Sequence, residues 1–442
     1  MSQFPTTIGK VQTRFFEFCD TLHPLHLQCG VNLERFVLAY EIYGKINAAR
    51  SNVILLFHAM TGSQHAAGIN RDVPGLDGRW TDEMHEGWWN GFIGPGKALD
   101  TRKFAVVCAN YLGGCYGSTG PASINPATGQ PWGPAFPVLR ISDIVDSQVH
   151  LLNHLGVRKL HAVIGASLGG FLSLSFATRY PSRVDTVVPI ASGLETTILQ
   201  RIMNFEQVTA IESDPNFRGG DHYNGAHPES GLALARSIAH KTFISLETLQ
   251  QRARHEVVSD APPFGWYAMN SPVESYLLHQ GRKFVSRFDA NSYLRILDAW
   301  QWFDLLTETG AKNFSELFTR NRNQRFLIFS IDSDGAFPVQ EQKTLVHYLK
   351  AAEVQHIWIT VHSDKGHDSF LLEPEFYAPH LSQVLHYAAP VSRSPRTRRP
   401  AARRLPLGQG KLEPEPGKDA RRKPRKILGN AGAFGKKIAK SA

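Results

Sequence analysis

The chain has 442 residues, 42% of them hydrophobic, which is enough apolar surface for one large domain with an insertion. Its net charge of +9 is local, because residues 391–442 hold 16 Lys and Arg against 3 Asp and Glu, and residues 1–390 carry −4. No run approaches the roughly 20 apolar residues of a membrane span, and four scattered cysteines without a CxxC pair argue against a disulfide framework or a structural zinc site. The first residues lack the pattern of a secretory signal, so we expect a cytoplasmic protein without a bound metal.

Short apolar runs alternate with amphipathic stretches from about residue 13 to residue 388, as in a doubly wound α/β domain. The runs are rich in β-branched residues and end at charges or turn residues, which predicts buried parallel strands. Residues 141–155 have apolar side chains three and four positions apart, which predicts an amphipathic helix. The predicted strands are residues 52–57, 104–109, 160–164, 186–190, 325–330 and 357–361.

The strand pattern disappears between residues 194 and 305, where helix-compatible segments such as 231–240 and 246–256 dominate. We interpret residues 194–305 as a helical cap inserted between two parts of an α/β core. The two parts of the core would then be residues 1–193 and 306–388. Residues 389–442 are dominated by Pro, Gly, Arg and Lys, and we expect them to form a disordered basic tail.

The predicted strand 160–164 leads directly into Gly-Ala-Ser167-Leu168-Gly, and a helix-compatible segment follows. Strand, sharp turn and helix is the context in which a G-x-S-x-G motif forms a nucleophile elbow. The turn strains the backbone of the serine and raises its hydroxyl above the sheet, and small flanking residues leave room for that geometry. We therefore predict an α/β-hydrolase fold with a mostly parallel central sheet, an inserted helical cap and Ser167 as the nucleophile.

A serine hydroxyl needs a base that takes its proton and a carboxylate that orients this base. In this fold the acid and then the histidine follow the serine along the chain. The last two predicted strands run into loops that contain Asp332 and Asp334, and His362 and His367. His367 is the better placed of the two histidines because it follows a glycine on the longer part of its loop. The residues alone do not separate Asp334 from Asp332.

The acyl intermediate also needs an oxyanion hole, built from the backbone N–H that follows the nucleophile and from one in a loop after an earlier strand. Leu168 supplies the first donor. The turn at residues 58–62 follows the predicted strand 52–57 and is the candidate for the second. Its spacing does not single out one residue.

Several longer sequence blocks accompany the elbow. They are HAMTG at 58–62, GWW at 87–89, IGPGK at 93–97, NYLGGCYGSTGP at 110–121, SINPATG at 123–129, VESYL at 273–277, FDANSY at 288–293 and GHD at 366–368. With these blocks the chain resembles the homoserine O-acyltransferase family over about residues 14–388. Members of that family have the α/β-hydrolase fold and acylate homoserine from an acyl-CoA in methionine biosynthesis.

The resemblance implies a role for individual residues of this chain. Ser167 corresponds to the nucleophile, Asp334 to the acid and His367 to the base. Met60 and Leu168 correspond to the two backbone donors of the oxyanion hole.

Two further residues correspond to the site that binds the acceptor. Arg236 resembles the arginine that holds the substrate carboxylate, and Asp368 resembles the acidic residue that holds the substrate amine. The chemistry agrees, because an amino acid needs one cation and one anion, and the planar guanidinium suits a carboxylate. Without the resemblance, Arg236 would be read as a surface charge and Asp368 as a carboxylate that stabilises its loop.

The chain departs from the family at three positions near the site. Leu168 and Phe171 stand where the family often has Met, and both changes are apolar. Gly335 follows the predicted acid, where members that use succinyl-CoA often have Trp, and this favours acetyl-CoA. The basic tail matches nothing in the family.

We therefore expect a homoserine O-acetyltransferase that works by a ping-pong reaction, with acetyl-CoA as co-substrate and no cofactor, and that forms a homodimer through its helical region. Three alternatives stay open for the reaction: succinyl transfer, serine as the acceptor, and ester hydrolysis. A different class of function would use the tail to bind nucleic acid or another anionic surface. Against it, the tail has a single aromatic residue, Phe434, for base stacking.

Overall fold

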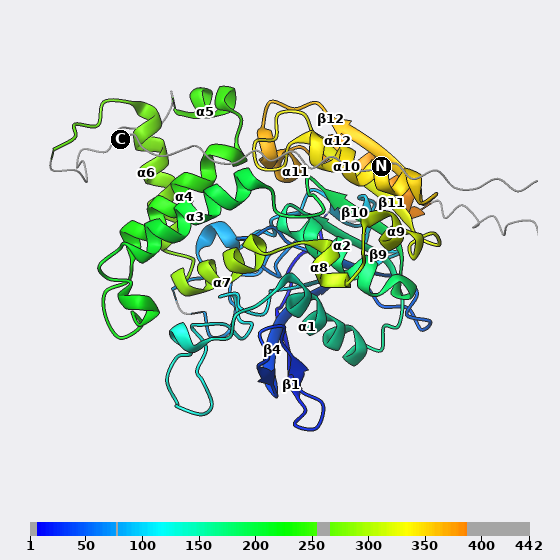
Figure 1. Ribbon diagram of the computed structural model, residues 1–442, viewed down its shortest axis with the longest axis horizontal. Helices are drawn as coiled ribbons and strands as arrows, with labels where there is room; N and C mark the ends of the chain where they lie inside the picture. The colour runs from blue at the N-terminus through cyan, green and yellow to red at the C-terminus, as the bar shows by residue number, and fades with distance from the viewer. Residues whose placement is uncertain (1–6, 77, 254–265, 387–442) are drawn as a thin grey trace, which may run out of the picture. The chain divides into compact units, whose positions relative to one another are not determined.

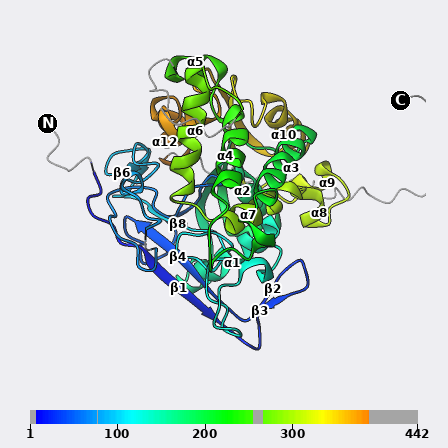
Figure 2. The same cartoon turned by 90° about the vertical axis from the view of Figure 1, so that its left-hand side faces the viewer.

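The computed structural model describes residues 7–76, 78–253 and 266–386 (Figures 1 and 2). Its central element is an eight-stranded sheet in the order β1-β4-β8-β5-β9-β10-β11-β12. The strands β1 and β4 are antiparallel to their neighbours, and all pairs from β8 to β12 are parallel. The strands are β1 (Arg14–Cys19), β4 (Arg35–Tyr43), β8 (Ala105–Ala109), β5 (Val53–Phe57), β9 (Leu160–Ala166), β10 (Val184–Ile190), β11 (Arg325–Ile331) and β12 (Gln355–Val361).

Two layers of helices and loops cover the sheet. Alternate side chains of one strand pack to opposite faces, so Leu55 belongs to one core and Leu56 to the other. The first core includes side chains of α1 (Ile141–His154), α2 (Leu168–Arg179) and α10 (Val339–Ala351). The second includes α12 (Pro374–His386) and the segment that carries the two-residue strands β6 (Ile93–Gly94) and β7 (Leu99–Asp100). A further short pair is β2 (Leu25–His26) with β3 (Asn32–Leu33).

The six predicted strands all form, with ends within two residues of the expected positions. The structure adds β1 and β4 at one side of the sheet, which the apolar pattern did not indicate. Glu41 interrupts that pattern in β4, yet it is completely buried. Its carboxylate accepts hydrogen bonds from Thr13 at 2.8 Å, Tyr43 at 2.6 Å and Asn70 at 2.9 Å, and lies 2.8 Å from His65 Nδ1. These partners compensate for removing the charge from water.

Helices dominate the chain between β10 and β11. Among them, α4 packs against both α3 and α6, as both views show (Figures 1 and 2). Side chains of Thr197, Ser271 and Asp289 cap the first turns of α3, α6 and α7 by accepting backbone hydrogen bonds. The helices of this segment are α3 (Ile198–Glu212), α4 (Glu229–Phe243), α5 (Leu246–Ala253), α6 (Pro272–Val285) and α7 (Ala290–Gln301).

The remaining helices are short and flank the last two strands. They are α8 (Leu305–Thr309), α9 (Phe314–Thr319) and α11 (Ser369–Leu372). The expected helix at 246–256 corresponds to α5 up to Ala253, and its last three residues lie outside the described part of the chain, as does the predicted tail at 389–442. No helix of the described residues combines the length and apolarity that crossing a membrane requires.

Candidate active site

Ser167 lies in the sharp turn between β9 and α2, at the carboxyl end of the parallel sheet. Its backbone is in a strained region with φ 59° and ψ −126°. The turn is tight enough that a Cβ on Gly165 would lie 1.9 Å from the carbonyl oxygen of Gly169, and one on Gly169 would lie 2.4 Å from that of Phe57. Only glycine fits at these two positions. The backbone N–H of Ser167 is fixed by a 2.9 Å hydrogen bond to the carbonyl of Ile190.

His367 and Asp334 come from the loops after β12 and β11, and their side chains are joined. His367 Nδ1 lies 2.7 Å from one carboxylate oxygen of Asp334. The other oxygen accepts 2.8 Å hydrogen bonds from the backbone N–H groups of Ala336 and Phe337, so the carboxylate is held on both sides. Nδ1 is thus occupied by Asp334, and Nε2 of His367 is buried and bonds to no group within the described residues.

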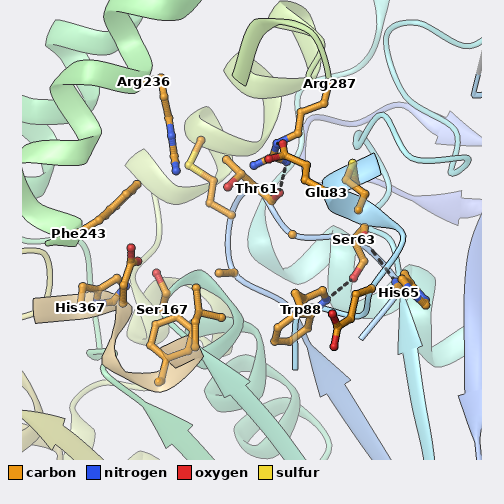
Figure 3. Close-up of a pocket in the computed structure, with 18 of the residues that line it drawn as sticks. Thr61, Ser63, His65, Glu83, Trp88, Ser167, Arg236, Phe243, Arg287 and His367 are labelled. Carbon is orange, nitrogen blue, oxygen red and sulfur yellow. Dashed lines mark hydrogen bonds and ion pairs between the residues drawn. The ribbon is translucent and has the colours of Figure 1, made fainter. Parts of the chain in front are cut away.

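His367 and Ser167 line the same cavity, and Figure 3 shows their side chains next to each other at its floor. The alternative acid and histidine form a pair of their own. Asp332 lies 2.8 Å from His362, whose side chain is 83% exposed. This pair is therefore at the surface, and the structure brings Asp334 and His367, rather than Asp332 and His362, to the serine.

The charges around His367 affect its protonation. Burial disfavours the imidazolium, but the Asp334 carboxylate, its hydrogen bond and the nearby Asp368 together raise the pKa of His367 above 6.5. Burial raises the pKa of Asp368, against the opposing effects of His367 and Arg236. A raised pKa means that His367 binds a proton more readily than a free imidazole does. This property suits a general base.

The loop at residues 58–62 carries the second expected oxyanion donor. It follows β5 and is held by hydrogen bonds from Tyr111 Oη to the carbonyl of His58 and from the N–H of Gly62 to Ala59 at 2.9 Å. Met60 lines the cavity beside Ser167, and its N–H donates to no acceptor in the described part of the chain. Leu168 is the first residue of α2, where backbone N–H groups lack intrahelical acceptors. The structure therefore places Met60 in the same cavity as Ser167, and Leu168 directly after it at the start of α2.

Arg236 and Asp368 reach the cavity from α4 and from the loop after β12. Arg236 points into it from above in Figure 3. Its guanidinium lies 5.3 Å from the ring centre of Phe243 and 5.2 Å from that of Phe284, and it forms no ion pair with any described residue. Burial, followed by repulsion from Arg287, lowers the pKa of Arg236. Among the charged residues that line the cavity, Arg236 and Asp368 are thus a cation and a carboxylate that do not form an ion pair with each other.

Arg287 is a cavity residue that the sequence analysis did not single out. It follows α6 and donates to the carbonyl of Thr61 at 3.3 Å and to Tyr116 Oη at 2.8 Å. Its Nε lies 3.1 Å from a carboxylate oxygen of Glu83, which belongs to the short helix η1 (Asp82–Met84). Arg287 therefore ties the helical segment to the loop that carries Met60. Its only sequence signal was its place directly before the block at 288–293.

The cavity has a volume of about 300 Å³, which suits a small polar substrate together with the reactive end of a larger one. Within the described residues, no cluster of three or more His, Cys, Asp or Glu side chains could hold a metal ion. Cys108 and Cys115 are buried free thiols, and Cys19 and Cys29 are exposed ones. The reactive groups at the cavity are therefore the serine, the imidazole, the carboxylates and the backbone amides.

Comparison with known proteins agrees with this geometry. Residues 52–374 match the α/β hydrolase fold family. The homoserine O-acetyltransferase of Solidesulfovibrio magneticus is 40% identical over 375 residues, which cover 83% of this chain and 90% of that protein. The homoserine O-acetyltransferase of Mesorhizobium japonicum is 43% identical over 360 residues, which cover 80% of this chain and 89% of that protein.

Solved structures show the same fold. Esterase E22 has a TM-score of 0.75 with 25% identity, over 85% of this chain and all of that chain. The homoserine O-acetyltransferase of Bacillus anthracis also has a TM-score of 0.75, with 24% identity over 85% of this chain and 98% of that chain. At this level of identity the structures establish the architecture, and the assignment rests on the relatives at about 40% identity. The chain belongs to the homoserine O-acetyltransferase family of acyltransferases, which have the α/β-hydrolase fold.

Proposed function

We propose that this protein transfers an acetyl group from acetyl-CoA to the hydroxyl of L-homoserine, through an acetyl ester on Ser167, as a step of methionine biosynthesis. The observation that carries the proposal is the content of one cavity. It combines a hydrolase-type nucleophile and base with the cation of Arg236 and the carboxylate of Asp368. This set can bind the two charged groups of an amino acid while its hydroxyl approaches the base.

In the first half-reaction, His367 Nε2 takes the proton of Ser167, and the serine oxygen attacks the thioester carbonyl. The N–H groups of Met60 and Leu168 donate to the oxyanion of the tetrahedral intermediate. When this intermediate collapses, the C–S bond breaks and His367 gives its proton to the CoA sulfur. The acetyl group is then an ester on the serine.

In the second half-reaction, Arg236 binds the carboxylate of homoserine and Asp368 its ammonium group. His367 takes the proton of the homoserine hydroxyl, whose oxygen attacks the acetyl ester. Collapse of the second intermediate returns the proton to Ser167 and releases O-acetylhomoserine. Binding at two points gives homoserine the positional advantage that it needs over water, which is far more concentrated. Every group in this scheme belongs to the protein or to the two substrates, so the scheme requires no cofactor.

The choice of acetyl rather than succinyl rests on the surroundings of Asp334. Gly335 follows the acid, and a Cβ there would meet Thr242 of α4 at 3.5 Å. Gly335 therefore lies at contact distance from the helical segment, at the position where family members that use succinyl-CoA often have Trp, and this favours acetyl-CoA.

Ester hydrolysis is the second candidate, and a specific observation favours it. Esterase E22 is as similar in structure as the Bacillus anthracis acetyltransferase is, so the architecture alone does not separate the two reactions. An ester hydrolase, however, has no need for a half-buried arginine without an anionic partner. Such a group destabilises the protein unless a ligand neutralises it.

The test is the rate of CoA release with acetyl-CoA and succinyl-CoA, each with homoserine, with serine and without acceptor. We expect rapid release with acetyl-CoA and homoserine and slow release in the other five mixtures. Equal release with and without homoserine would identify a thioesterase and contradict the proposal. A preference for serine or succinyl-CoA would keep acyl transfer but change the substrates.

We also propose a homodimer in the cytoplasm. The outer face of α3 exposes Ile198, Leu199, Ile202 and Phe205, whose exposed fractions are 77%, 52%, 52% and 67%. A contiguous apolar face of this kind on a helix is typical of a contact between proteins. Light scattering of the wild-type protein and of Phe205→Glu tests the proposal, with a dimer and a monomer as the expected states. A wild-type monomer at micromolar concentration would contradict it.

The basic tail lies outside the described residues, so its binding to nucleic acid stays an alternative that an experiment must test. Deleting residues 391–442 should leave acetyl transfer intact. If the deletion removed both activity and salt-sensitive retention on nucleic acid, the tail would have to be part of the function.

A further inference from the structure

A second, small cavity lies behind one wall of the catalytic cavity. Met60, Phe243 and Trp300 line both cavities. Side chains of α3, including Gln200, Asn204 and Gln207, form much of the opposite wall of the small one. We call this small cavity the rear chamber. Its volume of about 10 Å³ is the space of roughly one oxygen-sized group.

Two residues that line the rear chamber, Trp300 and Asn204, each carry a hydrogen-bond donor without an acceptor among the described residues. Trp300 is 5% exposed and Asn204 is 3% exposed. Trp300 Nε1 and Asn204 Nδ2 are both buried, and neither donates to any described residue. Buried donors rarely lack an acceptor in native proteins, so both of these donors call for an acceptor atom within reach.

The neighbouring amides are already committed. Gln200 Nε2 donates to the carbonyl of Ala336 at 2.8 Å, and Gln207 Oε1 accepts from Tyr293 Oη at 2.5 Å. None of the lining residues is Lys or Arg. The chamber therefore suits a neutral oxygen that accepts hydrogen bonds, and it offers no counter-charge to a carboxylate.

The position of Met60 relates the rear chamber to the reaction. If its N–H holds the oxyanion, the acyl carbon lies against this wall, and the chain of the acyl group extends along it. The acceptor site is made by Arg236 and Asp368, neither of which lines the rear chamber. Phe243 packs against Arg236, so we assign the rest of the shared wall, Met60 and Trp300, to the acyl group.

We propose that the rear chamber is the subsite for the far end of the acyl group, where Trp300 and Asn204 hold a single water and thereby limit the acyl group to acetyl. The inference rests on the proposed acyl-serine mechanism and names two residues that select the acyl donor. An acetyl group ends at the wall and leaves the water in place. A propionyl group would push its last carbon into the chamber and expel the water.

Two consequences decide the selectivity. An apolar carbon cannot accept the hydrogen bonds of the displaced water, so both donors would stay unpaired, and this outweighs the gain from burying one methyl group. We expect discrimination of about tenfold against propionyl, within the range for one methylene in an enzyme pocket. A succinyl group would place its carboxylate beside neutral donors with no cation to pair with, which is less favourable still.

The packing of Trp300 keeps its indole in place. Its ring stacks on Phe337 with centres 5.5 Å apart and meets the edge of Phe171 at 6.2 Å. Phe337 in turn stacks on His367 at 5.3 Å. Phe171, one of the departures from the family pattern, therefore supports the residue that we propose as the selector.

The experiment measures acyl-enzyme formation from p-nitrophenyl acetate, propionate and butyrate, which require neither CoA nor homoserine. Trp300→Phe removes one donor and keeps a ring, and Asn204→Leu removes the other with little change in volume. Trp302→Phe is the matched control, because Trp302 is 56% exposed and its indole donates to Asp298 at 3.1 Å, away from both cavities.

We expect the wild-type protein to favour acetate over propionate by about tenfold. Trp300→Phe and Asn204→Leu should each reduce this preference severalfold, and Trp302→Phe should leave it unchanged. Circular dichroism checks that each variant is folded. If Trp300→Phe or Asn204→Leu does not fold, the other variant tests the inference. Wild-type rates that are equal for acetate and propionate, or a preference that both variants retain, would overturn the inference. Ester selectivity without any homoserine-dependent release of CoA would instead contradict the proposed function alone.

Discussion

Arg236 and Arg287 lie over the same aromatic ring, each with its guanidinium carbon 5.2 Å from the centre of Phe284. Arg287 has a carboxylate partner in Glu83 at 3.1 Å, whereas Arg236 has none among the described residues. Of the two guanidinium groups, that of Arg236 is therefore the one available to an anion. The substrate carboxylate would supply the missing partner, and Arg287 would keep the site attractive without binding it directly.

Replacing Arg236 tests this division of roles. Arg236→Met should lower kcat/KM for homoserine by about 100-fold, or roughly 2.7 kcal/mol, because the carboxylate loses its cation. Arg236→Lys should lose less, since it keeps the charge without the planar fork. Acetylation of Ser167 in the absence of homoserine should change little in either variant. A normal KM for homoserine in Arg236→Met would show that another group binds the substrate carboxylate.

Arg287 should affect a different step. Its hydrogen bond to Thr61 positions the loop of Met60, so Arg287→Met should slow the acetylation half-reaction by about tenfold to 100-fold. The KM for homoserine should change less than kcat. Lys283→Met is the matched control, because Lys283 also pairs with Glu83 but does not contact the loop. Stopped-flow acetylation rates decide the matter, and equal losses in the two variants would show that the ion pairs serve stability only.

The sequence predicted the parts of the site that lie next to strand ends. Ser167 was identified from the elbow motif, and His367 from its place after the last strand. Asp334 and Asp332 are two residues apart on one loop, and only the fold shows that one faces inward to His367 while the other pairs with the exposed His362. The order of the strands and the contact of Arg287 with the loop at 58–62 depend on residues far apart in the chain.

The strands β1 and β4 and the rear chamber were not predicted for related reasons. A buried glutamate disrupts the apolar pattern of β4, and its four partners come from three separate segments. The rear chamber is formed where α3, α4 and α7 meet, and its donors, Asn204 and Trp300, have no spacing that sequence reasoning could recognise. Burial of polar groups is decided by tertiary packing.

The pH profile of the reaction should report His367. It must be neutral to act as a base, and its pKa is raised above 6.5, so kcat/KM should fall as the pH drops through that raised value. Asp334→Asn removes the charge that raises this pKa and leaves the effect of burial. The acid limb should therefore move to lower pH, while the plateau falls by about 10⁴-fold. If the acid limb of Asp334→Asn stayed at the same pH, a group other than His367 would be responsible for it.

Glu341 should make the stability of the protein depend on pH. Burial, and then the charge of Asp334, raises the pKa of Glu341 from 4.5 to about 8. The folded state therefore holds a proton that the unfolded state releases above pH 4.5, and the free energy of unfolding falls as the pH rises from there toward 8.

Glu341→Gln should remove that dependence and gain about 3 kcal/mol at pH 7 relative to the wild-type protein. Urea unfolding at several pH values measures the effect, and Glu212→Gln, at the exposed end of α3, is the control. If the free energy of unfolding changed with pH in the same way in the wild type and in Glu341→Gln, the pKa of Glu341 would not be raised in the folded protein.

The most direct measurement is the mass of the protein after incubation with acetyl-CoA in the absence of homoserine. We predict the addition of a single acetyl group, located on Ser167 by peptide mapping and absent from Ser167→Ala. Adding homoserine should discharge it to O-acetylhomoserine faster than water does. A fully active enzyme that never carries the acetyl group, or a Ser167→Ala variant with near-normal turnover, would contradict the covalent mechanism.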